Sequence, residues 1–211
     1  MARSTIQRSN WRRLRELIGA ETPVARCHQV HGTKVRVVTR ENISDKPEGD
    51  GMVTAEPAIL LAVVSADCVP ILMVDAACNI VGAIHAGWRG IIAGIAEQGI
   101  CAMERLGAKR REIKVALGPS IGQCCFEVDE ELAQRFGREV AGSDRYARPG
   151  QPGKSHLDLR AIVTDQLTRA GLAPESIISV GPCTKCANDR YFSRRANASS
   201  GLQLSFIGTR T

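Results

Sequence analysis

The stretch "AILLAVVSADCVPILMVDAACNIVGAIH", residues 58–85, decides the fold. It contains three apolar runs of strand length, at 58–65, 69–75 and 79–85, and short polar breaks separate them. Continuous apolar runs are typical of strands that are buried on both faces. We therefore expect a central sheet that is covered on each side.

The sequence on both sides of this stretch supplies helices and further strands. The spacing of apolar residues predicts helices at 11–19, 91–107, 129–137 and 157–171, strands at 35–38, 113–118 and 176–181, and a loop at 143–156. Hairpins and helical crossovers both occur in this order. We therefore predict an α/β fold over residues 1–211, a single-domain layered sandwich with a mixed β-sheet flanked by helices.

The composition argues against several classes of protein. The 211 residues contain no apolar run long enough to span a membrane, and the first residues do not resemble a secretory signal. The net charge is +6, but the arginines are scattered and aromatic residues do not interleave with them, which argues against nucleic acid. We expect a cytoplasmic protein whose eight cysteines are free thiols or metal ligands, with no membrane or nucleic-acid partner.

Polar residues that could take part in catalysis or metal binding occur where the predicted strands end. His31 precedes one strand, Asp67 and Cys68 separate two apolar runs, and His85 ends the third run. Two imidazoles and a thiolate suit zinc with an open fourth position, and they would also accept copper. The same residues allow a Cys68 nucleophile with His85 as its base, or half-buried polar groups without chemistry.

Two further segments contain candidate binding residues. In "LGPSIGQCCFEV" (117–128), Gly118, Ser120 and the loop amides could face an anion, and one of the adjacent cysteines, Cys125, could face the cavity. "CTKC" (183–186) is a redox or half-zinc signal. Since no second such pair exists, we expect Cys183 to pack or to line the site and Cys186 to be incidental.

A third segment, "YFSRR" (191–195), ends in two arginines. Arginine forks suit phosphate or carboxylate, so Arg195 is a candidate anion ligand. An exposed basic turn without a ligand is the alternative.

These motifs occur together, and in this order, in one known family. "VHG", "SADCVP", "HAGWRG", "GPSIGQCCFEV", "HLDL" and "CT…YFS.R" resemble the bacterial multicopper polyphenol oxidase-like family. It is also called the laccase-domain or purine nucleoside phosphorylase-like family, and it includes peptidoglycan editing factors. The resemblance covers about residues 28–207. It implies an α/β sandwich with zinc, or copper, bound by His31, Cys68 and His85.

The resemblance also implies an activity. Members are described as phosphorolysing adenosine, inosine and S-methyl-5'-thioadenosine, and adenosine deamination is also attributed to them. An older label, copper-dependent polyphenol oxidation of the laccase type, fits poorly, because four histidines cannot build a multicopper cluster. The fold is also similar to that of Cys-His deamidase toxins, so a Cys-His hydrolase and a poorly active nucleoside-binding protein remain alternatives.

Roles for the remaining residues follow as expectations. Arg89 and Arg195 would hold phosphate beside the nucleoside, Asp67 would orient a ligand or transfer a proton, and Trp88 would stack on a purine or pack under the turn. Gly87 would allow a close backbone approach. We expect a monomer or a homodimer that binds nucleoside and phosphate.

The chain departs from the family pattern in two places. It lacks an upstream segment with "STR.GG" and "LN.G", and the family's "FFSYRRDG" becomes "YFSRRANA". Arg195 keeps the position of the first arginine, whereas Ala196 replaces the second. Both changes weaken the expected anion site.

Overall fold

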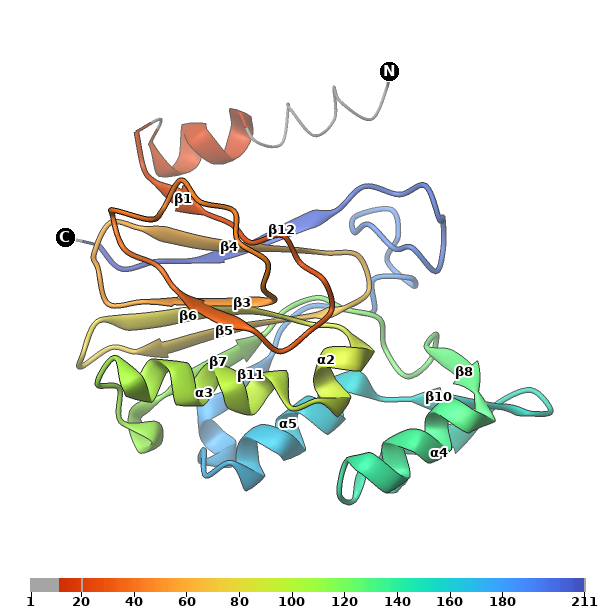
Figure 1. Cartoon of the computed structure of the whole chain (residues 1–211). Helices are drawn as coiled ribbons and strands as arrows, with labels where there is room; N and C mark the ends of the chain where they lie inside the picture. The colour runs from red at the N-terminus through yellow and green to blue at the C-terminus, as the bar shows by residue number, and fades with distance from the viewer. Residues whose placement is uncertain (1–11, 20, 211) are drawn as a thin grey trace.

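The computed structural model describes residues 12–19 and 21–210 of the chain. A small sheet lies over one face of a large sheet, and helices cover the other face (Figure 1). This mixed α/β arrangement confirms the predicted fold class. Residues 12–18 are helical, as predicted, while Trp11 lies outside the described residues.

The large sheet has six strands, and its centre is the hairpin formed by the second and third apolar runs. These runs pair antiparallel from Val69↔Ala86 to Asp75↔Ile80. Two pairs, β2 with β3 and β7 with β11, are parallel, so the sheet is mixed. In spatial order the strands are β11 (Ile177–Ser179), β7 (Lys114–Leu117), β5 (Val69–Asp75), β6 (Ile80–Ala86), β3 (Gly51–Thr54) and β2 (Val35–Val37).

The first apolar run does not join this sheet. It forms the middle of a three-stranded sheet of β1 (Val24–Ala25), β4 (Leu60–Ser65) and β12 (Gln203–Ile207). The expectation of one central sheet that contains all three runs is therefore wrong. The two sheets stack on one another (Figure 1), so Leu61 and Val63 of β4 are buried between them, whereas Leu60 and Val64 are only half-buried.

Alternation along the strands explains the continuous apolar runs. In β5, Ile71 and Met73 pack in the cluster that contains the helices, whereas Leu72 and Val74 pack against the cluster between the sheets. Successive side chains of a strand point to opposite faces. A strand between two apolar layers must therefore be apolar at every position.

The helices on the outer face differ from the prediction in one place. The predicted helix at 91–107 is two helices, because Gly94 has φ +82° and interrupts the backbone in the left-handed region. The helices are α2 (Trp88–Ile92), α3 (Ile95–Arg105), α4 (Glu130–Glu139) and α5 (Leu159–Arg169), with short 3₁₀ turns η1 (Arg110–Glu112), η2 (Ser143–Tyr146) and η3 (Pro174–Ser176).

A third sheet occupies the segment that was expected to be a loop. The strands β8 (Glu127–Asp129), β10 (Lys154–Leu157) and β9 (Ala147–Pro149) pair antiparallel, so a loop over 143–156 is wrong. Here a hairpin returns through glycine- and proline-rich residues, and those residues concealed its short strands. Among the described residues, every helix is too short or too polar to cross a membrane.

Candidate metal centre and adjoining loops

Three side chains from separate parts of the chain converge at one end of the hairpin β5–β6. The ligand atoms of His31, Cys68 and His85 all lie within 4.8 Å of one another. The Cys68 sulfur is 4.0 Å from Nε2 of His31, and the two imidazole rings meet edge to face with centroids 4.9 Å apart. His85 is buried and His31 is exposed, so the group opens to the surface on one side.

A buried carboxylate, Asp50, organises this group. One oxygen accepts hydrogen bonds from Nδ1 of His85 at 2.9 Å and from the backbone N–H of His31 at 2.9 Å. The other accepts the backbone N–H groups of Val30 and Gly32 at 3.1 and 2.7 Å. Asp50 therefore holds the backbone of one histidine and the ring of the other, and it leaves Nε2 of His85 free to face Cys68.

Sequence reasoning missed Asp50. The only local signal is "GDG" at 49–51, a carboxylate between two glycines. A Cβ atom at Gly51 would lie 2.5 Å from Cδ1 of Ile84, so the backbone beside Asp50 packs directly against β6. The sequence gives no hint of that contact.

The electrostatics of the group favour a thiolate beside an imidazolium when no ion is bound. Burial raises the pKa of Cys68, but hydrogen bonds from His31 and His85 outweigh it and lower that pKa to about 7. Burial lowers the pKa of His85, whereas the bonds to Asp50 and Cys68 raise it to about 9. Burial likewise opposes ionisation of Asp50, yet His85 and the backbone amides lower its pKa overall.

The donor set fits a tetrahedral metal ion with one open position. Ideal zinc geometry places a sulfur and an imidazole nitrogen about 3.6 Å apart, slightly less than the 4.0 Å between Cys68 and His31. A histidine ligand usually donates its second N–H to a carboxylate, as His85 does to Asp50. These residues could therefore hold zinc, or copper, after a small inward movement.

The turn after β6 lies close to this group. A Cβ atom at Gly87 would be 2.6 Å from Cδ2 of His31 and 3.4 Å from the Cys68 sulfur. A Cβ atom at Gly90 would be 2.9 Å from the backbone oxygen of Gly32. Both glycines therefore permit a close backbone approach, which the sequence analysis suggested for Gly87.

The two candidate substrate residues of this turn lie on its outer side. Trp88 is half-buried and packs against the main core, and the guanidinium of Arg89 lies 4.2 Å from the centre of its ring. Arg135 approaches the same ring at 5.9 Å. Arg89 is exposed. The Trp88 ring lies between the core on one side and the two arginines on the other, and it supports the turn.

Asp67 connects the centre to the C-terminal part of the chain. Its carboxylate accepts the hydroxyl of Thr184 at 2.7 Å and the backbone N–H of Arg195 at 2.8 Å. Its backbone has φ +88°, an uncommon conformation for a residue other than glycine, immediately before Cys68. Asp67 therefore positions the segment that contains Arg195, while Asp50 orients the ring of His85.

Arg195 itself is exposed. Its guanidinium donates to the backbone oxygen of Glu127 at 2.6 Å and lies 5.4 Å from the centre of the Phe126 ring. A guanidinium has five N–H donors, so others are left for an anion.

The loop that was expected to cradle an anion uses part of its backbone internally. The N–H of Gly118 donates to the backbone oxygen of Pro70 at 2.9 Å, and the N–H of Ile121 donates to the backbone oxygen of Asp67 at 2.9 Å. Those two amides are unavailable to a phosphate, so fewer amides of this loop could bind an anion than the sequence suggested. Ser120 is completely buried, and its hydroxyl has no hydrogen-bond partner among the residues that the structure describes.

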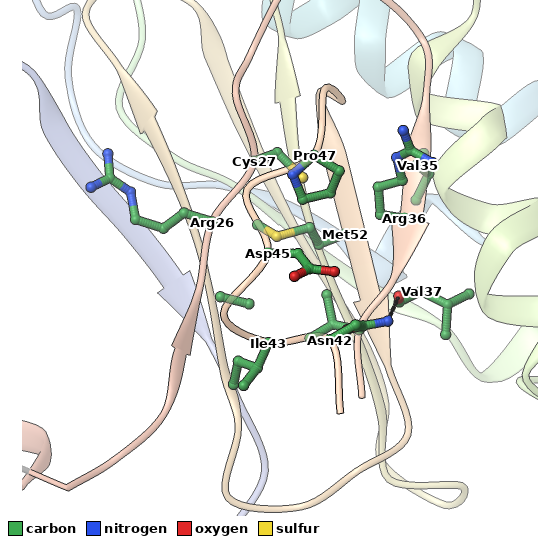
Figure 2. A pocket seen from close by; sticks show the side chains of 12 residues that line it. Arg26, Cys27, Val35, Arg36, Val37, Asn42, Ile43, Asp45, Pro47 and Met52 are labelled. Carbon is green, nitrogen blue, oxygen red and sulfur yellow. Dashed lines mark hydrogen bonds between the residues drawn. The ribbon is translucent and has the colours of Figure 1, made fainter. Parts of the chain in front are cut away.

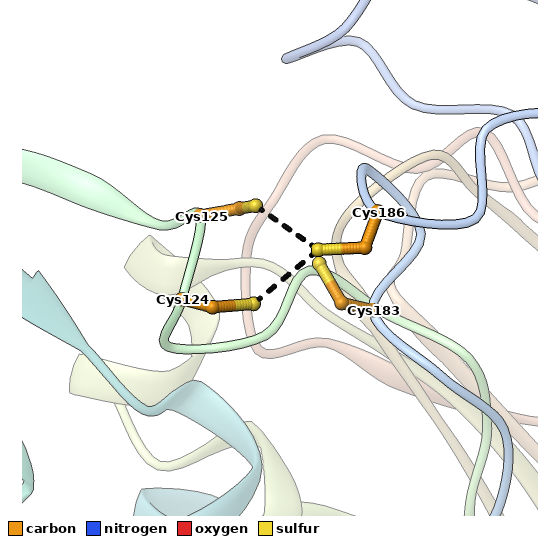
Figure 3. A group of neighbouring side chains, drawn as sticks. All are labelled: Cys124, Cys125, Cys183 and Cys186. Atoms are coloured by element: carbon orange, nitrogen blue, oxygen red, sulfur yellow. Dashed lines mark hydrogen bonds between the residues drawn. The ribbon is translucent and has the colours of Figure 1, made fainter.

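The same loop meets the C-terminal segment at a second cluster of thiols. The sulfurs of Cys124, Cys125, Cys183 and Cys186 all lie within 4.8 Å of one another (Figure 3). The expectation that Cys186 is incidental is wrong, because its sulfur is 3.6 Å from that of Cys124 and 3.5 Å from that of Cys125. Cys125, a candidate substrate contact, belongs to this cluster. All eight cysteines are free thiols in the structure.

A hollow of about 330 Å³ lies elsewhere, beside β1, β2 and β3 (Figure 2). Arg26, Cys27, Arg36, Asn42 and Asp45 are among the side chains that line it. Its lining includes none of the three candidate ligands.

Comparisons with known proteins identify the family of this chain. A family described as multi-copper polyphenol oxidoreductase laccase matches residues 3–210. Purine nucleoside phosphorylase YlmD of Geobacillus stearothermophilus is 36% identical over 96% of this chain and 78% of its own length. Its crystal structure superposes with a TM-score of 0.88, at 34% identity over 95% of this chain and 78% of that one. Adenosine deaminase RL5, from an unknown prokaryotic organism, is 40% identical over 75% of this chain and 61% of its own length. The chain therefore belongs to the multi-copper polyphenol oxidoreductase laccase family, as the sequence motifs indicated.

Proposed function

We propose that the protein is a metal-dependent purine nucleoside phosphorylase, with adenosine, inosine and S-methyl-5'-thioadenosine as candidate substrates. The observation that carries the proposal is the convergence of His31, Cys68 and His85, with Asp50 on the second nitrogen of His85. Relatives named purine nucleoside phosphorylase support the choice of reaction.

Phosphorolysis places three demands on the chain. A phosphate oxygen forms a bond to C1' of the sugar while the bond from C1' to the purine nitrogen breaks. The electron pair leaves with the purine, which takes up a proton, and the sugar emerges as its 1-phosphate. The site must therefore hold phosphate, support positive charge that develops on the sugar, and assist the departing base.

The residues divide between these tasks. When bound at His31, Cys68 and His85, the ion would supply Lewis-acid chemistry. Asp50 keeps the proton of His85 on Nδ1, which fixes the ring and directs Nε2 into the site. Arg89 and Arg195 are exposed cations that would orient phosphate, and Asp67 fixes the backbone of Arg195.

The test combines metal content with turnover. Protein purified without added metal is analysed for zinc and copper, and then assayed with inosine and adenosine with and without phosphate. We expect phosphate-dependent release of free base that is lost on chelation and restored by zinc. Release of base without phosphate, or no release from metal-loaded protein, would contradict the proposal.

The role of Arg195 has a separate test. Arg195→Ala should chiefly raise the KM for phosphate while the zinc content stays the same, with Arg194→Ala as the neighbouring control. Unchanged phosphate dependence would refute the assignment.

Adenosine deamination is a second candidate activity, because the relative named adenosine deaminase RL5 is 40% identical. Release of ammonia from adenosine, measured beside base release in the same samples, distinguishes the two reactions. Loss of both activities in Cys68→Ala would place them at one centre.

A Cys-His hydrolase is favoured by a different observation, the low pKa of Cys68, about 7, beside two histidines. Chelation would then leave activity intact, and a thiol-alkylating reagent would abolish it. Zinc protection of Cys68 from alkylation would instead support the metal centre.

A further inference from the structure

The four-cysteine cluster, defined by Cys124, Cys125, Cys183 and Cys186, lies outside the proposed catalytic group. Two of its members follow one another in the turn before β8, and the other two form a C-x-x-C pair in the segment after β11. Figure 3 shows the four sulfurs directed toward a common point between these two segments. Nothing in the proposed nucleoside chemistry uses them.

The separations match a single ion bound by four thiolates. Zinc binds cysteine sulfur at about 2.3 Å, so the edge of an S₄ tetrahedron is about 3.8 Å. The sulfur of Cys186 lies 3.6 and 3.5 Å from those of Cys124 and Cys125, and every pair is within 4.8 Å. Small movements of side chains would complete the tetrahedron.

A disulfide explains the arrangement less well. A sulfur–sulfur bond is about 2.05 Å long, and a disulfide joins only two partners. Cys186 approaches two sulfurs almost equally, at 3.6 and 3.5 Å, and Cys183 lies in the same group. A four-iron cluster would need wider spacing, because each thiolate then binds a different iron.

The backbone around Cys183 suits a metal-bound thiolate. Cys183 is half-buried and forms an isolated β-bridge with Ser120. The chain turns tightly here, since the N–H of Ala187 donates to the backbone oxygen of Cys183 at 3.0 Å. C-x-x-C is a common spacing of zinc ligands, and this turn brings the two sulfurs of the pair to one side.

Gly122 provides room for the cluster on the opposite side. A Cβ atom there would lie 3.1 Å from Cβ of Cys183 and 3.3 Å from the sulfur of Cys124. The bond from the N–H of Thr184 to the backbone oxygen of Ser120, 3.0 Å, holds the two segments side by side. The close approach is therefore built into both backbones.

The irregular segment 180–202 has little apolar burial of its own, so a bound metal ion would stabilise it. Residues 180–202 contain no helix or strand, although the structure describes all of them. Their buried side chains are few and small: Thr184, Ala187 and Ser193. Long irregular segments in compact proteins are usually functional, and segments with little apolar burial are commonly stabilised by metals or disulfides.

We propose that Cys124, Cys125, Cys183 and Cys186 bind one structural zinc ion that fastens the segment 180–202 to the turn before β8. Binding releases thiol protons and involves no oxidation. Through the bonds of Asp67 to Thr184 and Arg195, the same fastening fixes one wall of the catalytic opening. This second site would therefore act on the first only by position.

Metal stoichiometry tests the proposal directly on the full chain. We expect two zinc ions per chain in the unmodified protein, and one each in Cys186→Ser and His31→Ala. X-ray absorption on His31→Ala should show only sulfur ligands, at about 2.3 Å. The stoichiometry in Cys186→Ser and the spectrum of His31→Ala do not depend on any enzymatic activity, so they remain decisive if the proposed function fails.

Controls separate loss of zinc from loss of folding. Cys101→Ser, on α3 and outside both groups, should keep two zinc ions. Cys186 and Cys124 are exposed, so serine at either position should leave the core intact, and Cys124→Ser should repeat the result of Cys186→Ser. Cys186→Ser, without the ion of the cluster, should be cut faster by trypsin at the exposed Arg190 and Arg194.

Three results would overturn the proposal. The first is an unchanged zinc content in both Cys186→Ser and Cys124→Ser. The second is nitrogen in the zinc shell of His31→Ala. The third is a mass lower by two hydrogens that reduction restores, which would show a disulfide among these cysteines.

Discussion

The two groups of candidate metal-binding side chains are held in different ways. The first, His31, Cys68 and His85, lies where strands of a buried sheet end, and Asp50 ties two of its members together at 2.9 Å. The four-cysteine cluster joins two irregular segments, which are also connected by the backbone bond from Thr184 to Ser120 and by the Arg160 guanidinium, bound to the oxygens of Gly181 and Ser120. A rigid scaffold positions the first group, whereas the second has too little apolar burial to hold its own segments.

This difference predicts different consequences of removing a ligand. A preorganised centre should keep its shape without metal and lose only its chemistry. A site between loops should lose local order, because metal binding and folding are there the same event. The same loss of local order at both sites after removal of a ligand would contradict this difference.

The largest expected effect comes from Cys68→Ala. It should lose the ion of the first site and reduce phosphorolysis to background, because a three-ligand site cannot spare its thiolate. The structure should survive, since Cys68 is only half-buried beside strands that other residues hold. Zinc analysis, base release and thermal unfolding on one sample measure all three quantities.

Cys186→Ser is the matched comparison for this variant. It should keep the first ion and measurable turnover, with a lower melting temperature and a higher KM for phosphate. Complete loss of turnover in Cys186→Ser, with the first ion still bound, would show that the cluster takes part in the chemistry.

The next effect in size is the dependence of zinc affinity on pH. Cys68, with a pKa of about 7, and His85, with a pKa of about 9, must both lose a proton before they can bind. Each released proton strengthens binding up to about tenfold per pH unit. Because of these two groups, the zinc affinity of the first site should rise most steeply with pH below pH 7, less steeply between pH 7 and pH 9, and little above pH 9.

The four-cysteine cluster should behave differently. Burial and the neighbouring Cys186 raise the pKa of Cys124 to about 11 and raise that of Cys125 further. Affinity there should continue to rise above pH 9. Titrations of Cys186→Ser and His31→Ala with a competing chelator measure each site alone, and equal slopes above pH 9 would contradict the difference.

Asp50→Asn should have an intermediate effect, confined to the first site. The amide preserves the size of the side chain but replaces one acceptor oxygen with a donor, so the bonds to His85 and to the amides of Val30 and Gly32 cannot all persist. We expect about 10–100-fold weaker zinc binding there, as for other residues that orient a ligand. Glu48→Gln, in the same loop, is the control. Equal weakening of the four-cysteine cluster would show a general loss of structure.

The sequence predicted the first group far better than the second. His31, Cys68 and His85 could be identified because each stands next to the end of a predicted strand, and because the family resemblance implied the three together as ligands. Residues 69–75 were predicted with the bounds that the structure has, because a strand buried on both faces has a strong signature. Asp50 was missed because its role depends on a contact with β6 rather than on a local pattern.

The four-cysteine cluster was missed for a related reason. Cys124 and Cys186 are 62 residues apart, and neither lies in a regular element. The strands β1, β3 and β12 were also missed, since short strands are stabilised by their partners more than by their own residues. The break at Gly94 was missed because a glycine within a helical pattern does not by itself specify a left-handed conformation.

The smallest expected effects come from a pair of glycines, one beside each group. At Gly87 a Cβ atom would lie 2.6 Å from Cδ2 of His31, so Gly87→Ala must displace a ligand ring. At Gly122 it would lie 3.1 Å from Cβ of Cys183, a milder conflict that two irregular segments can absorb by moving apart. We expect a several-fold loss of zinc affinity at the first site in Gly87→Ala and a smaller loss at the cluster in Gly122→Ala. Zinc competition titrations measure both. The reverse order would mean that the cluster is the more rigid of the two, and the contrast between a preorganised centre and a metal-fastened pair of loops would then fail.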